Sequence, residues 1–382
     1  MEPSPSMYDL TLPRKICFGV HSSERLPEIL PASARRVFLV AGSHTVRSGL
    51  AGRLVSLLKQ SGREVLLVEG AGSEPPPEEI DSLVKAAREF RADCAAAVGG
   101  GSVIDAAKAA AALVPMEGCC MDYFSGKAAI DRPGLFFAAI PTTAGTGAEM
   151  TSNSVLTDPS SNVKKSLRSP FMTPAAALND PLLLADAPLP VIAFCGLDAF
   201  VQAAECYTST RGNPVSRALA LSALKALAVN LPAFYDDPRN EAARDRTAEA
   251  SMTTGIAFAQ TGLGAVHGLA HPAGALLHIP HGEACAILMP SVFRFNAETV
   301  PGPYEEMARA LNVGTGASDF IRFTESLNRK FGIPADLKSF GLKREHFPFL
   351  IKNCRSGSMK TNPRPMSDEQ VRSLLTSLLG DR

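Results

Sequence analysis

The first half of the chain alternates short apolar runs with amphipathic segments. The apolar runs predict four buried strands, at residues 36–41, 64–68, 94–98 and 135–140. The amphipathic segments predict helices over residues 46–60 and 77–90, and a third that ends near residue 113. Because strands and helices alternate, we expect a doubly wound parallel sheet with helices on both faces.

The pattern changes after about residue 188. Strand-like runs end there, and longer helical patterns follow at residues 191–208, 214–235, 241–260 and 264–278. Two proline steps, Asp180-Pro181 and Leu189-Pro190, interrupt the chain between these regions. We therefore predict an α/β domain at residues 1–188 and an all-helical domain at residues 189–382.

Composition and charge exclude several classes of protein. The chain has 38 basic and 38 acidic residues, so electrostatics gives no reason to expect nucleic acid or a membrane as a partner. No run approaches the roughly 20 apolar residues of a membrane span, and the N-terminal residues lack the pattern of a signal peptide. The eight cysteines are scattered without a CxxC pair, so we expect reduced core thiols in a cytoplasmic protein.

A glycine-rich turn follows the third predicted strand. Gly99, Gly100 and Gly101 separate this strand from Ser102, which we expect to be the N-cap of the next helix. Glycines let backbone N–H groups approach a ligand closely, and a helix N-terminus favours an anion. The turn is therefore a candidate pyrophosphate cradle, although a purely structural turn is the alternative. It lacks the GxGxxG pattern, so an ordinary Rossmann dehydrogenase is not supported.

A second polar loop follows the fourth predicted strand. Residues 141–149 read PTTAGTGAE, and the three threonines and two glycines offer hydroxyl and backbone donors to phosphate or ribose oxygens. A surface loop rich in Gly and Thr is the alternative. If both loops follow strands of one parallel sheet, they share its carboxyl edge, where ligands bind.

Four of the seven histidines lie within residues 267–281, namely His267, His271, His278 and His281. This density favours metal or proton chemistry. The HxxxH spacing of His267 and His271 resembles that of zinc proteases. The general base that those enzymes need after the first His is replaced here by Gly268, which disfavours a hydrolase.

Asp198 lies in the first predicted helix of the second domain and can supply an oxygen ligand. With His267 and His281 it makes one carboxylate and two imidazoles. This donor set suits Zn(II) or Fe(II) and leaves coordination positions open. Taken alone, Asp198 is equally well explained as a helix cap or a partner in an ion pair.

Together these motifs resemble the iron-containing (group III) alcohol dehydrogenase family over nearly the whole chain. The matching blocks are GGGSVIDAAK, PTTAGTGAE, Asp180-Pro181, GLDAF, GLGAVHGLAHPAGA, PHGEACAILMP and Asn362-Pro363-Arg364. The resemblance implies a dehydroquinate synthase-like fold, in which a nucleotide-binding domain and a helical metal domain enclose the active site. It also implies an NAD(P)-dependent alcohol dehydrogenase or aldehyde reductase that forms a homodimer or a larger homo-oligomer.

The resemblance assigns roles to individual residues. The implied cofactor-binding residues are Gly99, Gly100, Gly101, Ser102, Thr142, Thr143, Thr146, Asn153, Lys164 and Leu183. Metal ligation carries over to Asp198, His267 and His281, and His271 matches a His beside the nicotinamide that relays a proton. The implied chemistry is polarisation of the substrate oxygen by the metal, with hydride passing between the carbinol carbon and nicotinamide C4.

Two positions depart from the family's common pattern. Gln202 stands where a His, one helical turn after Asp198, is the usual fourth ligand, and an amide oxygen is a weak ligand for Zn(II) or Fe(II). We still expect a divalent metal, with Gln202 as at most a weak ligand. Gly42 stands where NAD-preferring members carry an Asp that meets the ribose 2′-hydroxyl. A Gly beside Ser43 accepts a 2′-phosphate, so we expect NADP(H) rather than NAD(H).

Three alternative functions stay open at this point. A lyase resembling dehydroquinate synthase shares the architecture and the nicotinamide, but Asp198 and the HGLAHP block argue against it. An enzyme resembling maleylacetate reductases would depend little on metal. Loss of catalysis, which Gln202 suggests, is disfavoured because the other metal positions and His271 are retained. The substrate is expected to be a small alcohol or aldehyde, which the sequence does not identify.

Overall fold

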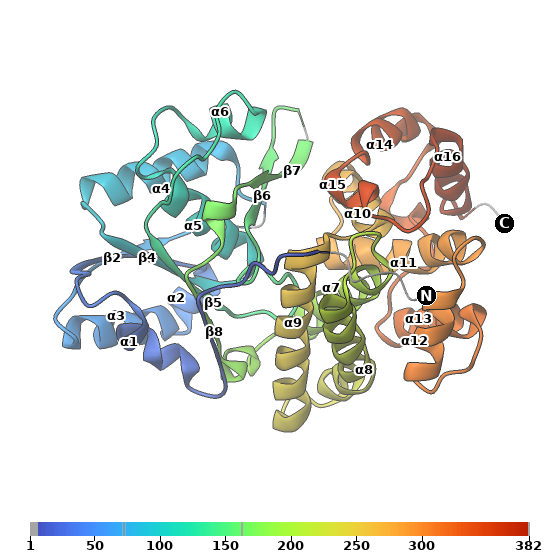
Figure 1. The fold of residues 1–382 in the computed structure, drawn as a ribbon, viewed down its shortest axis with the longest axis horizontal. Coiled ribbons are helices and arrows are strands. Elements are labelled where there is room, and N and C mark those ends of the chain that lie inside the picture. Colours follow the sequence, from blue (N-terminus) through green and yellow to red (C-terminus); the bar gives the residue numbers. More distant parts are fainter. Residues whose placement is uncertain (1–6, 71, 73, 162, 381–382) are drawn as a thin grey trace.

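The computed structural model describes residues 7–70, 72, 74–161 and 163–380, which form an α/β half and a helical half lying side by side (Figure 1). The absence of a signal peptide was expected from the N-terminal residues, of which residues 1–6 lie outside the described part. The predicted combination of a parallel sheet and an all-helical C-terminal region is confirmed.

The α/β half is built on a six-stranded sheet among the described residues, in the order β1-β8-β5-β4-β2-β3. Every neighbouring pair of strands is parallel. The strands are β1 (Lys15–Phe18), β2 (Arg36–Ala41), β3 (Glu64–Glu69), β4 (Cys94–Gly99), β5 (Phe136–Pro141) and β8 (Ala176–Asn179). The sequence pattern predicts β2 to β5 and misses β1 and β8, which have only four residues each.

Helices cover both faces of this sheet. They are α1 (Leu26–Ile29), α2 (Ser43–Arg47), α3 (Leu50–Gln60), α4 (Pro77–Glu89), α5 (Gly101–Leu113) and α6 (Cys120–Ser125), with the 3-10 turns η1 (Ser22–Arg25), η2 (Pro170–Met172) and η3 (Pro181–Leu184). Phe38 and Val40 of β2 pack in the cluster that includes α4 and α5, whereas Val37 and Leu39 pack in the cluster that includes α3. The strand is thus buried on both faces, as a doubly wound sheet requires.

One predicted helix is split in two. A single helix was expected over residues 46–60, but α2 ends at Arg47 and α3 begins at Leu50. Gly49 lies between them with a φ of 79°, a left-handed conformation that stops a helix and that glycine adopts without strain. The prediction is therefore wrong at this break and right for the second helix.

A two-stranded antiparallel sheet, which the sequence pattern did not predict, joins the two halves. It consists of β6 (Asn153–Asp158) and β7 (Val163–Arg168). β6 packs on α5, and β7 packs on helix α10 (Ala265–Leu277) of the helical half. The carboxylate of Asp105 in α5 accepts a hydrogen bond from the backbone N–H of Val155 at 2.9 Å, and the ammonium of Lys108 donates to the carbonyl of Asn153 at 2.6 Å. These buried groups hold the hairpin in place beside the sheet.

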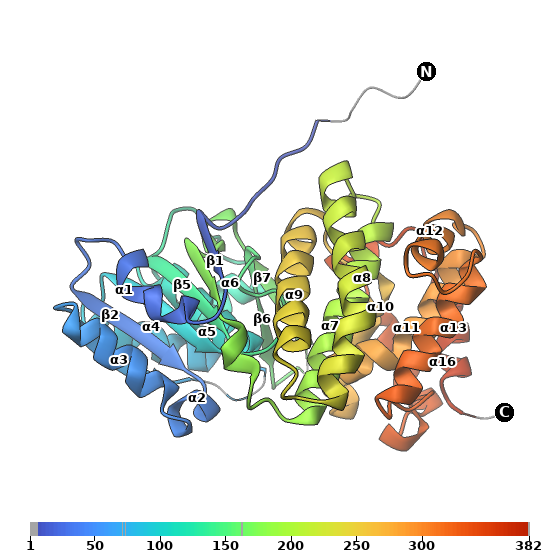
Figure 2. The ribbon, with the colours of Figure 1, turned by 90° about the horizontal axis from the view of Figure 1, so that it is seen from below.

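The helical half begins with α7 (Leu189–Thr208), which packs most extensively against three other helices (Figures 1 and 2). The remaining helices are α8 (Pro214–Asp236), α9 (Glu241–Thr261), α10, α11 (His281–Ala297), α12 (Gly302–Ala310), α13 (Ala317–Lys330), α14 (Phe347–Asn353), α15 (Gly357–Lys360) and α16 (Asp368–Ser377), with the 3-10 turns η4 (Lys338–Phe340) and η5 (Arg344–His346). Helices α8, α9 and α11 are the main neighbours of α7, and α12 makes a smaller contact with it. Because α7 is so enclosed, its polar residues Asp198, Gln202 and Glu205 are buried.

Two helices of the described chain, α7 and α8, are long and apolar enough to span a membrane by length and composition. The expectation that no segment would approach this limit is therefore wrong. In α7, 72% of the apolar 18-residue stretch is buried inside the protein, as expected for a core helix. In α8, 33% of the corresponding 18-residue stretch is buried, and this helix packs against α7 and α9.

The cysteines are all free thiols in the described structure. Six of them are buried, as expected for core thiols. Cys119 is exposed and Cys195 is partly exposed, so the expectation of core placement is wrong for these two.

Candidate active site and metal centre

A cavity of about 130 Å³ lies where the α/β half meets the helical half. The two loops, the β6–β7 hairpin and helices α7, α10 and α11 all contribute to its wall. The lining residues that the sequence singles out are Gly101, Ser102, Thr146, Asn153, Lys164, Asp198, Gln202, His267, His271 and His281. A larger groove of about 1010 Å³, lined mainly by α11, α13 and α16, contains none of these residues.

The glycine turn places the N-terminus of α5 at this cavity. The N-cap of α5 is Gly100, and Ser102 is the second helical residue, so the expectation that Ser102 caps the helix is wrong. Among the described residues no side chain caps α5, which leaves the N–H groups of its first turn available to an anion. A Cβ on Gly99 would lie 2.8 Å from Val103, and one on Gly101 would lie 2.6 Å from Thr146. Those two glycines are therefore needed for close packing.

The threonine loop packs directly against the glycine turn. The backbone N–H of Thr142 donates to the carbonyl of Gly99 at 2.9 Å. A Cβ on Gly100 would lie 3.6 Å from the methyl group of Thr143, which is an ordinary contact. The two loops therefore meet at the carboxyl ends of β4 and β5, where a doubly wound sheet binds ligands.

Six of the predicted cofactor-binding residues lie outside the residues that line the cavity, namely Gly42, Gly99, Gly100, Thr142, Thr143 and Leu183. Gly42 donates its N–H to the carbonyl of Val98, and a Cβ at this position would lie 3.2 Å from Val103. Gly42 is thus a neighbour of the glycine turn. Leu183 lies in η3 and packs with the apolar cluster on the α3 side of the sheet.

The hairpin contributes an ion pair that the sequence does not indicate. The ammonium of Lys164 lies 2.6 Å from the carboxylate of Glu74, and the backbone N–H of Glu74 donates to the hydroxyl of Ser102 at 3.4 Å. Asn153 donates from its amide to the hydroxyl of Ser166 at 3.4 Å. Glu74 has a φ of 64°, which is uncommon for a residue other than glycine. Its place after β3, at the carboxyl edge of the sheet, is the signal that sequence reasoning overlooked.

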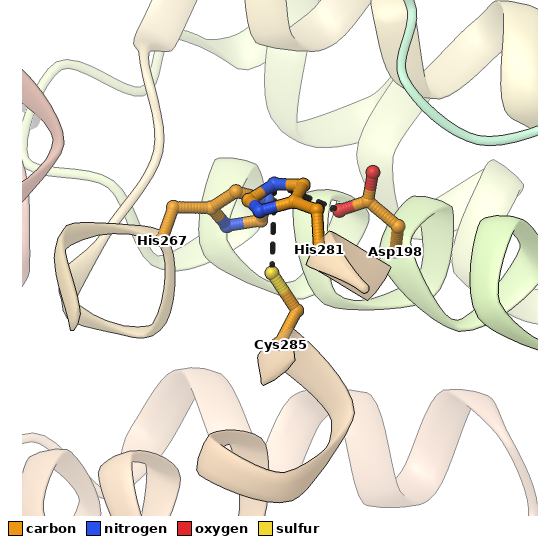
Figure 3. Close-up of side chains that lie close together, drawn as sticks. All are labelled: Asp198, His267, His281 and Cys285. Carbon is orange, nitrogen blue, oxygen red and sulfur yellow. Dashed lines mark hydrogen bonds and ion pairs between the residues drawn. The ribbon is translucent and has the colours of Figure 1, made fainter. Parts of the chain in front are cut away.

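Four potential metal ligands converge at the helical wall of the cavity (Figure 3). The carboxylate oxygen of Asp198 lies 3.0 Å from Nε2 of His267 and 3.9 Å from Nε2 of His281. The sulfur of Cys285 lies 3.7 Å from Nε2 of His281. One potential ligand atom from each of the four residues lies within 4.8 Å of each of the others. Cys285 is absent from the predicted ligand set, although its position four residues after His281 on one helix is a readable signal.

The two rings of this cluster are in different electrostatic surroundings. Burial alone disfavours the charged form of His267, but the neighbouring Cys285 and the carboxylates of Glu205 and Asp198 outweigh it and raise its pKa well above the usual value. Burial lowers the pKa of His281, and the positive charge of Lys164 lowers it further. The neutral imidazole that a metal needs is therefore favoured at His281.

His271 lies beside the cluster and also faces the cavity. Its ring stacks on that of His281, with 5.0 Å between the ring centroids and 10° between the planes. Burial lowers its pKa well below the usual value, followed by the effects of Lys164 and His267. His278 does not join the group, because it is exposed and ends α10 in a left-handed conformation.

The donor set and several unpaired polar atoms fit a divalent ion and a polar ligand. Within the described chain, Gln202 Oε1, His271 Nδ1 and His281 Nδ1 are buried without a hydrogen-bond partner. Such atoms are costly to leave unsatisfied, so they indicate a ligand or ordered water at the site. One carboxylate with two imidazoles suits Zn(II) or Fe(II).

Comparison with protein families decides to which group the chain belongs. A family model described as iron-containing alcohol dehydrogenase matches residues 13–181, and one described as the C-terminal part of the Fe-containing alcohol dehydrogenase family matches residues 192–379. The chain belongs to the iron-containing alcohol dehydrogenase family. The resemblance inferred from the GGGS, PTTAGTG and HGLAHP blocks is thereby confirmed.

Individual relatives within the iron-containing alcohol dehydrogenase family match the chain over almost its whole length. An NADPH-dependent butanol dehydrogenase of Clostridium saccharobutylicum is 32% identical, covering 96% of this chain and 97% of the relative. A 1,3-propanediol dehydrogenase of Citrobacter freundii is 30% identical, with coverage of 96% and 97%. The crystal structure of a sulfoacetaldehyde reductase from Bifidobacterium kashiwanohense in complex with NAD+ has a TM-score of 0.92 at 28% identity, covering 99% of this chain and 100% of that one. The butanol dehydrogenase is named for its dependence on NADPH, and the reductase structure contains NAD+.

Proposed function

We propose that this protein, an NAD(P)-dependent alcohol dehydrogenase by family, transfers hydride between NADPH and a small aldehyde with the help of a divalent metal. In this proposal residues 1–188 bind the nucleotide and residues 189–382 bind the metal and the substrate. The cytoplasmic location and the self-association expected from the sequence remain part of the proposal.

One observation carries the proposal: the nucleotide-type and metal-type residues line the same cavity. Gly101 and Ser102, at the uncapped start of α5, form one part of its wall. Asp198, His267 and His281 form another part. Hydride transfer requires the nicotinamide and the substrate carbon to be in contact, so both sets of residues must serve one small space.

The proposed nucleotide site uses backbone groups rather than cationic side chains for the pyrophosphate. The free N–H groups at the start of α5 and the hydroxyls of Thr142, Thr143 and Thr146 are the donors. Lys164 is held by Glu74 at the cavity wall and supplies the nearby positive charge. Gly42 and Ser43, at the end of β2, are the proposed neighbours of the ribose, where the absence of an acid favours the 2′-phosphate of NADP(H).

Asp198, His267 and His281 are the residues that would hold the metal, with Fe(II) or Zn(II) as the ion. A divalent ion bound there supplies Lewis-acid polarisation of the substrate's oxygen, and the nicotinamide supplies the hydride. Asp198 contributes the only negative charge among these three side chains. Its burial in α7 keeps that charge in a low-dielectric setting, where the attraction to a cation is strongest.

His271 is the proposed proton-relay residue. Its Nδ1 has no hydrogen-bond partner within the described chain, and its ring lies against that of His281. Because its pKa is lowered, the ring is neutral near pH 7 and can accept a proton at one nitrogen while donating from the other. The alkoxide formed by hydride addition needs such a proton before the alcohol leaves.

The test is the consumption of NADPH with a panel of aldehydes, before and after treatment with a chelator. We expect activity that falls with chelation and returns with Fe(II) or Zn(II). His267→Ala should lose both metal and activity, whereas His278→Ala, at the exposed end of the same helix, should keep both. A net change in NADPH absorbance also separates this reaction from that of a lyase that recycles its nicotinamide. Full activity in metal-free protein would overturn the metal's role.

A further inference from the structure

Cys285 occupies a position from which its sulfur reaches the proposed metal. It lies on α11, one helical turn after His281, and is fully buried. Figure 3 shows its side chain directed toward the imidazoles of His267 and His281. The sulfur is 3.7 Å from Nε2 of His281.

These distances match the spacing of ligand atoms around a single ion. Metal bonds of about 2.0 Å to nitrogen and about 2.3 Å to sulfur, in a tetrahedral arrangement, place the two ligand atoms about 3.5 Å apart. The observed separation from sulfur to nitrogen is 3.7 Å, and the separations from Asp198 to the two histidines are 3.0 and 3.9 Å. The four potential ligand atoms, which all lie within 4.8 Å of one another, are therefore close enough to approach one ion.

A second observation is the state of Gln202. This residue lies one turn after Asp198 on α7, is 2% exposed and lines the same cavity, yet its Oε1 has no partner within the described chain. That oxygen lies 3.8 Å from the position a Cβ would take on Gly147, which places it toward the threonine loop. An amide oxygen is also a weaker ligand than a thiolate for Zn(II) or Co(II). Gln202 on α7 is thus a weak potential ligand without a hydrogen-bond partner for its Oε1 among the described residues, whereas Cys285 on α11 is a stronger potential ligand.

We propose that the thiolate of Cys285 is the fourth protein ligand of the metal. It takes the role that a His at the position of Gln202 has in the family's common pattern. The inference rests on the proposed metal site formed by Asp198, His267 and His281. On binding, the S–H bond is replaced by a bond between sulfur and metal, and the proton passes to solvent. Gln202 is then left free to donate or accept a hydrogen bond with the substrate or a water beside the metal. A set with one sulfur favours Zn(II) or Co(II) over Mn(II) or Mg(II).

The experiment uses Co(II) as the probe, because a cobalt–thiolate bond gives a charge-transfer band in the near ultraviolet that oxygen and nitrogen ligands do not give. Metal-free full-length protein is titrated with Co(II) and followed by absorbance and by elemental analysis. We expect one Co(II) per chain and a charge-transfer band in the wild type. Cys285→Ser should lose the band and bind Co(II) at least about tenfold more weakly. Cys354→Ser is the matched control, because Cys354 is buried in the same half and its thiol donates to the carbonyl of Ile351.

The outcomes separate this inference from the proposed function. A bound cobalt without the band, or a band that survives in Cys285→Ser, overturns the role of Cys285 while the dehydrogenase proposal stands. A band that depends on Cys285 in a protein without NADPH-dependent activity supports the ligand and overturns the proposed function instead. If no Co(II) binds, the ligand role and the metal site both fail. The same band together with an unchanged affinity for Co(II) in Gln202→Ala would show that the amide is not needed as a donor.

Discussion

Glu205 holds His267 from the side opposite the proposed metal. Nδ1 of His267 lies 2.6 Å from Oε2 of Glu205, while Oε1 of Glu205 accepts a hydrogen bond of 2.7 Å from the backbone N–H of Val266. Both side chains are buried. With the Nδ1 proton donated to the carboxylate, Nε2 is left as the nitrogen that faces Asp198 and the metal. Carboxylate partners of this kind orient the imidazole ligand and raise its basicity.

The first prediction concerns this pair. Glu205→Gln preserves the shape of the side chain but replaces a charged acceptor with a neutral amide. We expect the affinity for Zn(II) or Co(II) to fall by about 10- to 100-fold. Competition with a chromophoric chelator would measure the loss. Glu306→Gln, which removes the carboxylate that bonds to Tyr207 away from the cavity, is the control. An unchanged affinity in Glu205→Gln would show that the ring needs no such partner.

The second prediction concerns the glycine turn, where Gly100 is expected to matter for NADPH binding and Gly101 for stability. Gly100 has a φ of −70°, and a Cβ there would make only an ordinary contact of 3.6 Å with Thr143, whereas Thr146 leaves no room for a Cβ on Gly101. Gly100→Val should therefore fold normally yet block the approach of the pyrophosphate, which calorimetry would detect as a loss of NADPH binding. Gly101→Ala should lower the thermal stability, since the threonine loop must move. Normal coenzyme affinity in Gly100→Val would remove the pyrophosphate from this turn.

The fold was readable from sequence wherever a local pattern determines the structure. The strands β2 to β5 are continuous apolar runs, and helices α7 to α10 follow clear helical periods, so both were predicted close to their observed bounds. The β6–β7 hairpin was missed because its strands carry mostly polar residues, among them Lys164 and Arg168. Its position depends on buried Asp105 and Lys108 of α5, which no local pattern links to it.

The site residues also divide into those that a local sequence pattern indicates and those whose role depends on a contact with a distant segment. Asp198, His267 and His281 were predicted because their residue types suit a metal and their surroundings match a family pattern. Glu205 and Glu74 were missed because each gains its role only through a contact with a distant segment, at His267 and at Lys164 respectively. Cys285 was interpreted as one more buried thiol, since sequence alone does not show which way a core side chain points.

The third prediction concerns the choice of coenzyme. Gly42→Asp should weaken NADPH binding by ~1–3 kcal/mol, because the new carboxylate repels the 2′-phosphate. A side chain at this position would also press on Val103, where a Cβ would lie 3.2 Å away. Gly42→Ala measures that steric effect without the charge. The ratio of kcat/KM for NADPH and NADH in the three proteins is the measurement, and a wild type that strongly prefers NADH would contradict the prediction.

The last prediction concerns Glu149, at the end of the threonine loop, which is almost fully buried beside Lys108. Burial raises the pKa of its carboxyl from the usual 4.5 to about 7, and the charge of Lys108 offsets only part of that effect. Between these two pH values the folded protein binds more protons than the unfolded chain, so the free energy of unfolding falls as the pH rises. The loss approaches about 3 kcal/mol and is complete above pH 7. Glu149→Gln cannot ionise, so its stability relative to the wild type should rise between pH 4.5 and 7 and then stay constant. Urea unfolding of both proteins across this range measures the difference, and parallel curves would mean that Glu149 is ionised in the folded protein throughout.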